Sequence, residues 1–278
     1  MVLFRSIDRE PITRVVTKSV TFIFYIKKRI LIFSLNTINL KRMFHSYSYL
    51  SFCTIFFGYI ISSGLLYYWY YMKNRLFKQC WKIQPKMNAN GSIQPYHWIL
   101  VFSNLFIASS FALGTTEMTI NKLNYITFED KNYLMILYDF FIAFIIQSIL
   151  EYVWHIWMHT DAIYSWCHKF HHSYKSPFPF ADMYIHPLEA TGYYCILYSP
   201  PLLMSNGIHY YAFMLYMLIL GICGILDHSG INFKFGYLYD VTFHDLHHQK
   251  FKVNYGFPSP LLDMVFGTYL SPDNFKSS

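Results

Sequence analysis

Residues 133–159 read YLMILYDFFIAFIIQSILEYVWHIWMH, and this stretch decides the architecture of the chain. Its first part, 133–150, is mostly apolar with Asp139 as its one charged residue, and it is long enough for a helix to cross the ~30 Å hydrocarbon layer of a bilayer. The apolar run leads directly into His155 and His159, whose spacing of four places both rings on one helix face. The stretch therefore predicts a membrane-spanning helix that ends in a pair of potential metal ligands.

The composition of the whole chain favours a lipid environment. Of 278 residues, 54% are hydrophobic and only 13% are charged, against about 25% charged in a typical soluble domain. Aromatic residues make up 21%, and Tyr and Trp favour the membrane–water interface. The net charge of +7 is therefore interpreted as basic loops that meet anionic lipid headgroups, and not as a nucleic-acid surface.

Further apolar runs predict additional membrane passages. Residues 47–72 carry no charge, and residues 97–114 form a second run of sufficient length. Residues 191–204 and 208–226 are expected to form a hairpin that enters the membrane and returns, with two prolines breaking its first arm. The sequence thus predicts an all-α, multi-pass transmembrane helical bundle.

The basic residues indicate how this bundle is oriented. Residues 73–86 contain five basic side chains and no acid, which marks a cytoplasmic loop and places the histidine motifs on the cytosolic side as well. The same topology puts the basic segment 1–46 on the opposite side, against the positive-inside tendency, and this segment is expected to be interfacial. The sequon at Asn90 falls in the predicted cytoplasmic loop and is expected to stay unmodified.

Histidine carries the strongest signal in the sequence. Ten of the 13 histidines form one HxxxH pair, two HxxHH clusters and two single residues, whereas His45, His97 and His209 stand apart and are expected to be interfacial or structural. On a helix, positions i, i+3 and i+4 share a face. The ten candidate ligands are His155, His159, His168, His171, His172, His186, His228, His244, His247 and His248.

Ten imidazoles beside a membrane indicate a metal centre. If all were structural, each ring would need its own partner next to lipid, whereas metal ions satisfy them together. Ten nitrogens are too many for one ion and fit two ions with four or five ligands each. Imidazole ligands leave zinc, iron, copper and nickel open. The zinc protease motif HExxH is absent from the sequence, and an all-nitrogen site beside lipid suits iron and oxygen chemistry.

Three carboxylates are candidates to orient these rings. Asp227 and Asp245 each neighbour a predicted ligand, and Glu151 lies one helical turn before His155, so each is placed to accept a hydrogen bond from an imidazole. The alternative roles are a helix cap or surface carboxylate for the aspartates and an interfacial charge for Glu151. Asp139 is a further functional candidate, because charges inside a membrane are costly.

The order of the histidine motifs resembles that of the fatty acid hydroxylase / sterol desaturase superfamily. The resemblance spans about residues 133–270 and is closest to sterol C4-methyl oxidases and fatty acid hydroxylase domain-containing proteins. The segments that carry it are the HxxxH at His155, the HxxHH at His168, His186-Pro187, Asp227-His228-Ser229-Gly230, Phe243-His244-Asp245-Leu246-His247-His248 and Asp263-Met264-Val265-Phe266-Gly267-Thr268.

The resemblance implies a catalytic domain at 133–270, after transmembrane helices and loops at 47–132 and before a tail at 271–278. It implies a four-helix transmembrane bundle under a cytosolic cap that holds two iron ions. The implied reaction hydroxylates a lipid C–H bond with O2 and electrons from NAD(P)H. Because the sequence lacks the His-Pro-Gly-Gly motif of a fused haem domain, the donor is expected to be a separate protein, cytochrome b5 or its reductase. The implied location is the endoplasmic reticulum membrane.

Other functions remain open at this stage. The same site would serve a lipid desaturase, in which a second C–H bond is cleaved in place of oxygen insertion. A membrane metal transporter or a non-catalytic metal-binding protein is the alternative of another class, and a transporter would need polar residues along its spans. Tyr184, Tyr193 and Tyr194 either line a substrate path or belong to an interfacial belt.

Overall fold

The structure is a computed structural model. The predictions for the basic N-terminal segment, His45, the sequon at Asn90 and the end of the tail fall outside the described residues. The residues that the structure describes are 46–73, 81–85, 95–123, 125–236 and 239–272.

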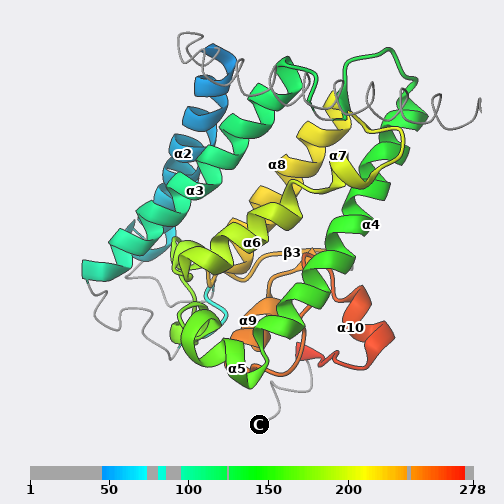
Figure 1. Ribbon diagram of the computed structural model, residues 1–278. Coiled ribbons are helices and arrows are strands. Elements are labelled where there is room, and N and C mark those ends of the chain that lie inside the picture. The colour runs from blue at the N-terminus through cyan, green and yellow to red at the C-terminus, as the bar shows by residue number, and fades with distance from the viewer. Residues whose placement is uncertain (1–45, 74–80, 86–94, 124, 237–238, 273–278) are drawn as a thin grey trace, which may run out of the picture. The chain divides into compact units, whose positions relative to one another are not determined.

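Within the described residues, four helices are long and apolar enough to cross a membrane, and they match the predicted runs 47–72, 97–114, 133–150 and 208–226. Figure 1 shows them beside one another, with the histidine-bearing segments gathered at one end. They are α2 (Ser46–Leu66, continued as a π-helix over Tyr67–Met72), α3 (Pro95–Ile120), α4 (Tyr133–Met158) and α8 (Tyr210–Asp227).

Helix α4 continues past the predicted end of its apolar run at Leu150. It starts at Asn132, whose side chain accepts a hydrogen bond from Met135 N at 2.9 Å, so that a free backbone donor of the first turn is satisfied. The helix then runs to Met158. His155 therefore lies beyond the apolar part of the span but on the same helix.

The first arm of the predicted hairpin, residues 191–204, is not one continuous helix. It consists of α6 (Pro187–Leu197) and α7 (Pro200–Leu203). The break falls where Pro200 and Pro201 lack backbone N–H donors. In Figure 1, α6 lies between α3 and α4, and α8 returns towards the histidines. The chain therefore enters and returns as expected, but with a broken first arm.

The end of the bundle opposite the histidines is closed by a short parallel strand pair. β1 (Ile126–Thr127) pairs with β2 (Ile208–His209), so the turn before α8 lies against the loop after α3. Gly207 enters this pair with φ +65°, and a Cβ there would lie 2.0 Å from Tyr125 O. Only glycine fits both the conformation and the close approach.

Asp139 has partners at this same end. Its Oδ2 accepts hydrogen bonds from Lys131 Nζ at 2.7 Å and from the backbone N of His209 at 2.9 Å. The carboxylate thus joins the start of α4 to the start of α8. These contacts give Asp139 a structural role far from the histidine motifs.

His97 and Tyr184 lie in the core of the bundle. The His97 ring stacks on Tyr184 with 4.7 Å between centroids, and its Nδ1 lies 3.0 Å from Tyr174 Oη. Nearby, Asn104 Nδ2 donates to the carbonyls of Met183 and Ile185 at 2.9 and 2.8 Å. These polar contacts fasten the segment before α6 to α3.

A cap of short elements covers the histidine end of the bundle (Figure 1). Most of its helices are a single turn, which suits a scaffold that has to turn sharply around a site. The described elements are α5 (Asp161–Ile163), η3 (Tyr164–His168), η4 (His171–Ser173), η5 (Ala181–Met183), the antiparallel pair β3 (Lys234–Phe235) and β4 (Tyr239–Asp240), α9 (Thr242–Lys250) and α10 (Leu261–Phe266).

Candidate metal centre

Nine of the ten predicted ligands come together in two groups. In each group the ligand nitrogens all lie within 4.8 Å of one another, and every ring except His159 is buried. The five-histidine group consists of His155, His159, His168, His172 and His247. The four-histidine group consists of His171, His228, His244 and His248.

Each HxxHH cluster divides its side chains between the two groups. On α9, His244 and His248 join the four-histidine group, whereas His247 joins the five-histidine group. Adjacent helix positions point about 100° apart, so His247 and His248 diverge from neighbouring positions on one helix. The i, i+4 pair, His244 and His248, therefore belongs to one group, and the i+3 residue, His247, belongs to the other.

The first HxxHH cluster divides in the same way but on a different backbone. His168 and His172 belong to the five-histidine group, and His171 belongs to the other. The expectation of one continuous helix is wrong here, because η3 is a π-helix that ends at His168 and η4 is a 3-10 helix that starts at His171. The break between the two turns sets the directions of these three rings.

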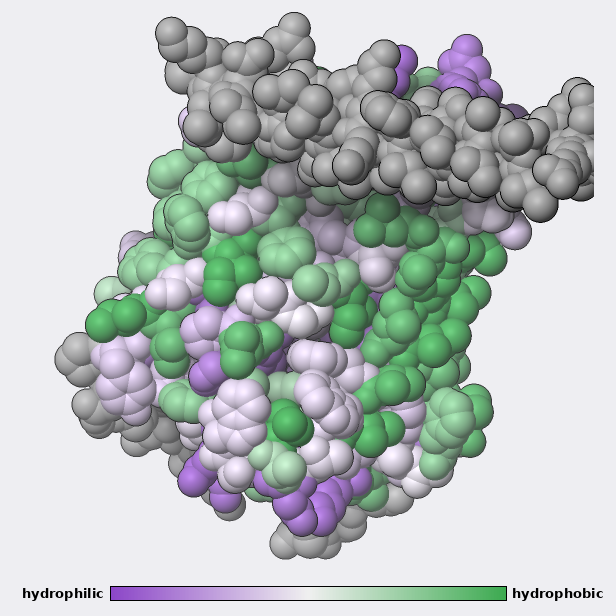
Figure 2. Space-filling view, in the orientation of Figure 1, coloured by the Kyte–Doolittle hydropathy of each residue, from purple (hydrophilic) through white to green (hydrophobic). Residues whose placement is uncertain are grey.

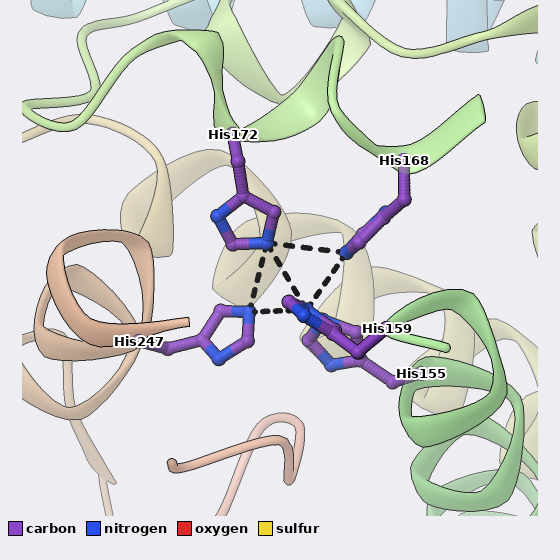
Figure 3. A group of neighbouring side chains, drawn as sticks. All are labelled: His155, His159, His168, His172 and His247. Atoms are coloured by element: carbon purple, nitrogen blue, oxygen red, sulfur yellow. Dashed lines mark hydrogen bonds between the residues drawn. The ribbon is translucent and has the colours of Figure 1, made fainter. Parts of the chain in front are cut away.

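The five-histidine group is built around converging Nε2 atoms (Figure 3). His159 Nε2 lies 3.2, 3.0 and 3.1 Å from the Nε2 atoms of His247, His168 and His172. His172 Nε2 also lies 3.2 Å from His168 Nε2 and 3.1 Å from His247 Nε2. Four rings thus make five nitrogen–nitrogen contacts.

The other ring nitrogens fix several tautomers. His155 Nδ1 lies 2.8 Å from Tyr255 O, and His247 Nδ1 lies 2.7 Å from Val253 O. A carbonyl only accepts, so both Nδ1 atoms carry the proton and both Nε2 atoms present a lone pair. His155 Nε2 is buried and has no hydrogen-bond partner among the described residues.

Hydrogen bonds alone do not account for this arrangement. Since His247 Nε2 has no proton, only His159, His168 and His172 can donate from Nε2, one bond each, so at most three of the five contacts are hydrogen bonds. The remaining contacts bring lone pairs together, which a cation stabilises. Metal–nitrogen bonds of about 2.1 Å place ligand nitrogens about 3.0 Å apart at right angles and about 3.4 Å apart at tetrahedral angles. The observed spacing fits the first arrangement.

In the four-histidine group, unlike the five-histidine group, hydrogen bonds can account for every nitrogen–nitrogen contact. His228 Nε2 lies 3.2 Å from His171 Nε2 and 2.9 Å from His244 Nε2, and His248 Nε2 lies 3.2 Å from His244 Nε2. His228 Nδ1 donates to Gly224 O at 2.9 Å, so its Nε2 is also a bare lone pair. His171, His244 and His248 can each donate from Nε2, so three donors are present for three contacts. The group also fits a metal, but without one its rings can hydrogen-bond to one another.

Burial keeps these rings neutral, which is the form that binds metals. Burial lowers the pKa of His228 to about 4. Burial and, secondarily, neighbouring imidazoles also lower the pKa of His168, His171, His244 and His248. A neutral imidazole has a free lone pair at pH 7, so no proton has to leave before a metal binds.

One carboxylate that contacts a ligand was not predicted from the sequence. Glu189 Oε1 lies 2.6 Å from His168 Nδ1, and its Oε2 has no hydrogen-bond partner among the described residues. Burial alone raises the pKa of Glu189, whereas a metal on His168 Nε2 favours the ionised carboxylate. We assign the proton to His168 Nδ1 on that ground. No signal in the sequence pairs Glu189 with a ring on a different element.

The three predicted orienting carboxylates have other partners. Glu151 accepts a hydrogen bond from Gln147 Nε2. Asp227 Oδ1 accepts from Tyr239 Oη at 2.6 Å. Asp245 accepts from the side-chain amides of Gln84 and Gln249, at 3.0 and 2.8 Å. All three carboxylates lie close to predicted ligands in the sequence, but none of these hydrogen bonds reaches an imidazole.

His186 is the one predicted ligand that lies outside both groups. Its Nδ1 accepts a hydrogen bond from Leu188 N at 3.2 Å, which makes it the N-cap of α6. The ring packs edge-on against Trp166 with 5.5 Å between centroids. Its place as the N-cap, directly before Pro187 at the start of the helix, gives His186 a structural role that needs no metal.

A cavity connects both groups with the interior of the bundle. His155 and His168 of one group and His171, His228 and His244 of the other line it. Its remaining wall is mainly apolar or aromatic and includes Trp154, Met158, Phe257, Tyr193 and Tyr194, together with Glu151, Asp182 and Glu189. A lipid segment in this cavity would lie against both groups at once.

In the described residues, four candidate membrane spans and nine convergent imidazoles at one end indicate a multi-pass membrane protein with two groups of side chains that could each hold a metal ion. Residues 140–268 match the family model described as Fatty acid hydroxylase. The resemblance predicted from the histidine motifs is therefore confirmed for this part of the chain.

Several known proteins similar to this chain are named for reactions on sterols. Methylsterol monooxygenase 1 of Gallus gallus is 28% identical over 212 residues, which cover 69% of this chain and 67% of the relative. A methylsterol monooxygenase of Aspergillus fumigatus is 27% identical over 149 residues, half of each chain. A Delta(7)-sterol 5(6)-desaturase of Gibberella zeae is 28% identical over 146 residues, 50% of this chain and 40% of the relative. The chain thus spans about half the length of the two fungal relatives. No solved structure matches the protein.

Proposed function

We propose that the protein is a membrane-bound di-iron oxygenase that hydroxylates a C–H bond of a lipid, either a sterol or a fatty-acyl lipid. The observation that carries this proposal is the convergence of nine imidazoles on two points beside one largely apolar cavity. The similar proteins named as methylsterol monooxygenases support an oxidoreductase and a sterol-like substrate.

Iron is the metal that the ligand set favours. Catalytic zinc normally takes three protein ligands in a tetrahedral site, whereas one group here offers five nitrogens, four of which make contacts at right-angle spacing. Imidazole is a common ligand of non-haem iron. Two iron ions, when bound, would supply the redox chemistry that activates O2.

The protein's own residues hold and shield this centre. The carbonyls of Tyr255 and Val253 keep the Nδ1 protons of His155 and His247, so both Nε2 atoms face the metal position. Apolar side chains such as Trp154, Met158 and Phe257 line the cavity and exclude water. Hydroxylation consumes one O2, two electrons and two protons for each C–H bond, and yields the alcohol and water.

The electrons come from NAD(P)H through a separate donor, cytochrome b5 or its reductase. The sequence carries no fused haem motif, and the cap is placed at one end of the candidate spans (Figure 1). The basic loop after the first span supports a cytosolic position for this end, in the membrane of the endoplasmic reticulum.

A desaturase is the second candidate. It is favoured by the similarity to the Delta(7)-sterol 5(6)-desaturase of Gibberella zeae. The same ligands and cavity would serve it, with the same electron donor. The two candidates differ in product: an alcohol or a new double bond.

The test combines metal analysis with lipid analysis. The chain is expressed in cells, purified in detergent and measured for iron and zinc, while lipids of the same cells are profiled by mass spectrometry. About two iron ions per chain and an oxidised sterol or acyl lipid are expected. A double variant, His159→Ala with His244→Ala, serves as the matched control. One zinc ion, or bound iron with no new lipid product, would contradict the proposal.

A further inference from the structure

Helix α10 exposes an apolar face outside the four candidate spans. Leu261, Met264, Val265 and Phe266 are 66%, 52%, 74% and 65% exposed, whereas Asp263 on the inner side is fully buried. Four large apolar side chains in six residues form an unfavourable surface in water, and such surfaces usually meet a partner or a membrane. The residues around α10 indicate whether its apolar face meets a partner protein or the membrane.

The apolar face of α10 continues the lipid-facing surface of α4. The Phe266 ring stacks on Tyr152 of α4 with 5.4 Å between centroids, and Tyr152 Oη lies 2.8 Å from Thr268 Oγ1. On the outer side of α4, Val153 and Trp157 are 61% and 47% exposed. Figure 2 shows hydrophobic surface along the α4 side of the molecule and onward to the region of α10.

The position of Tyr152 sets the depth of α10. Helix α4 ends at Met158, so Tyr152 lies about 9 Å before its end at 1.5 Å per residue. This depth is within the candidate span Tyr133–Met158, just past the end of its apolar run at Leu150, and near the Trp157 ring that suits an interface. Helix α10 therefore lies beside the last turns of a span, and not above them.

Contacts within the cap hold α10 rigidly in this place. Asp263 accepts hydrogen bonds from Tyr255 N at 2.7 Å, Gly256 N at 2.8 Å and Thr268 Oγ1 at 2.7 Å. A Cβ at Gly256 would lie 2.7 Å from Asp263 Oδ2, so the close approach requires glycine. The exposed face is thus presented by a fixed element.

We propose that α10 is an interfacial anchor whose exposed face lies in the acyl–headgroup boundary of the membrane leaflet next to the cap. The partner is the lipid surface itself, because the face is continuous with that of a span. The anchor has a direct connection to the metal centre: Asp263 holds Tyr255, whose carbonyl accepts the proton of His155. Lipid contact at α10 therefore supports the segment that orients a ligand.

The experiment measures where α10 lies. Val265→Cys is spin-labelled in the full chain, with the five native cysteines replaced by Ala, and reconstituted in phosphatidylcholine nanodiscs. Collision rates of the label with O2, which concentrates in lipid, and with a water-soluble nickel chelate are compared. Ile145→Cys, on the exposed side of α4, is the lipid control, and Asp161→Cys, on the exposed start of α5, is the water control.

The expected result for Val265→Cys is a high O2 and low nickel collision rate, close to that of Ile145→Cys. A high nickel rate, close to that of Asp161→Cys, would overturn the proposal. Low rates for both reagents would also overturn it, because they would show protein covering α10. If the cysteine-free chain does not fold, a photoreactive benzoylphenylalanine at position 265 of the otherwise unchanged chain replaces the label. A mass increase of one phospholipid then supports the proposal, and crosslinking only to protein overturns it.

Discussion

The two histidine groups differ in how far the protein fixes them before a metal binds. In the five-histidine group, Nδ1 atoms of three rings contact Tyr255 O, Val253 O and Glu189, and hydrogen bonds alone do not account for the five Nε2 contacts. In the four-histidine group, only His228 has a hydrogen-bond partner for Nδ1 among the described residues, Gly224 O. The first group is prepared for a cation, whereas the second can hydrogen-bond within itself when empty.

The difference teaches that two sites made from the same residue type need not bind equally well. Fixed tautomers and orientations lower the cost of assembling ligands, and partners of metal-bound imidazoles commonly change metal affinity 10–100-fold. We therefore expect the five-histidine group to hold its metal more tightly. The following substitutions test this comparison.

The largest effect is expected from His159→Ala. His159 Nε2 contacts three other ligand nitrogens, more than any ring of the four-histidine group. Removing it should reduce bound iron from about two ions to about one or none, because buried ligand sets lose binding free energy with each ligand. Lipid oxidation should fall to the level of cells without the protein. Unchanged iron content in the purified variant would contradict the assignment.

His244→Ala should remove the metal of the four-histidine group and leave that of the other. His244 Nε2 contacts His228 and His248 but is not part of the five-histidine group. Lipid oxidation should be lost as completely as in His159→Ala, yet one iron should remain bound after dialysis. If His244→Ala retains no iron, the prediction that the five-histidine group holds its metal more tightly is wrong.

Glu189→Ala should have an intermediate effect on the five-histidine group. Loss of the acceptor for His168 Nδ1 frees the ring to rotate and should weaken iron binding roughly 10–100-fold. Titration with a competing chelator measures this change. Asp245→Ala is the matched control, because Asp245 is buried but bonds to glutamines. Equal effects of the two variants would show that Glu189 acts only through general stability.

The smallest effect is expected from His186→Ala. The ring caps α6 and lies outside both groups, so iron content should stay the same. Loss of the cap should lower the free energy of unfolding by about 1 kcal/mol. Thermal unfolding and iron analysis of the same sample measure both quantities, and loss of an iron would return His186 to the ligand set.

The sequence predicts the parts of this molecule that follow from local pattern. Apolar length predicts the spans, and histidine spacing predicts eight of the nine residues that meet in two groups, the ninth being the single His228. The i, i+3, i+4 pattern does not tell that His247 leaves the group of its neighbour His248, because that depends on where the other ring-bearing segments lie. The partners Glu189, Val253 and Tyr255 were not predicted, because such contacts depend on tertiary structure and two of them are backbone carbonyls that any residue provides.

The divided HxxHH clusters have a consequence for the spacing of the two metals. His171 and His172 are neighbours in the chain and serve different groups, and so do His247 and His248. Adjacent Cα atoms are held about 3.8 Å apart by covalent bonds, and two such dipeptides bridge the sites from separate segments. When each group holds a metal, these two covalent links would limit how far the metals can move apart. Substitutions that loosen the bundle should leave this separation almost constant, whereas one residue inserted within either dipeptide should change it.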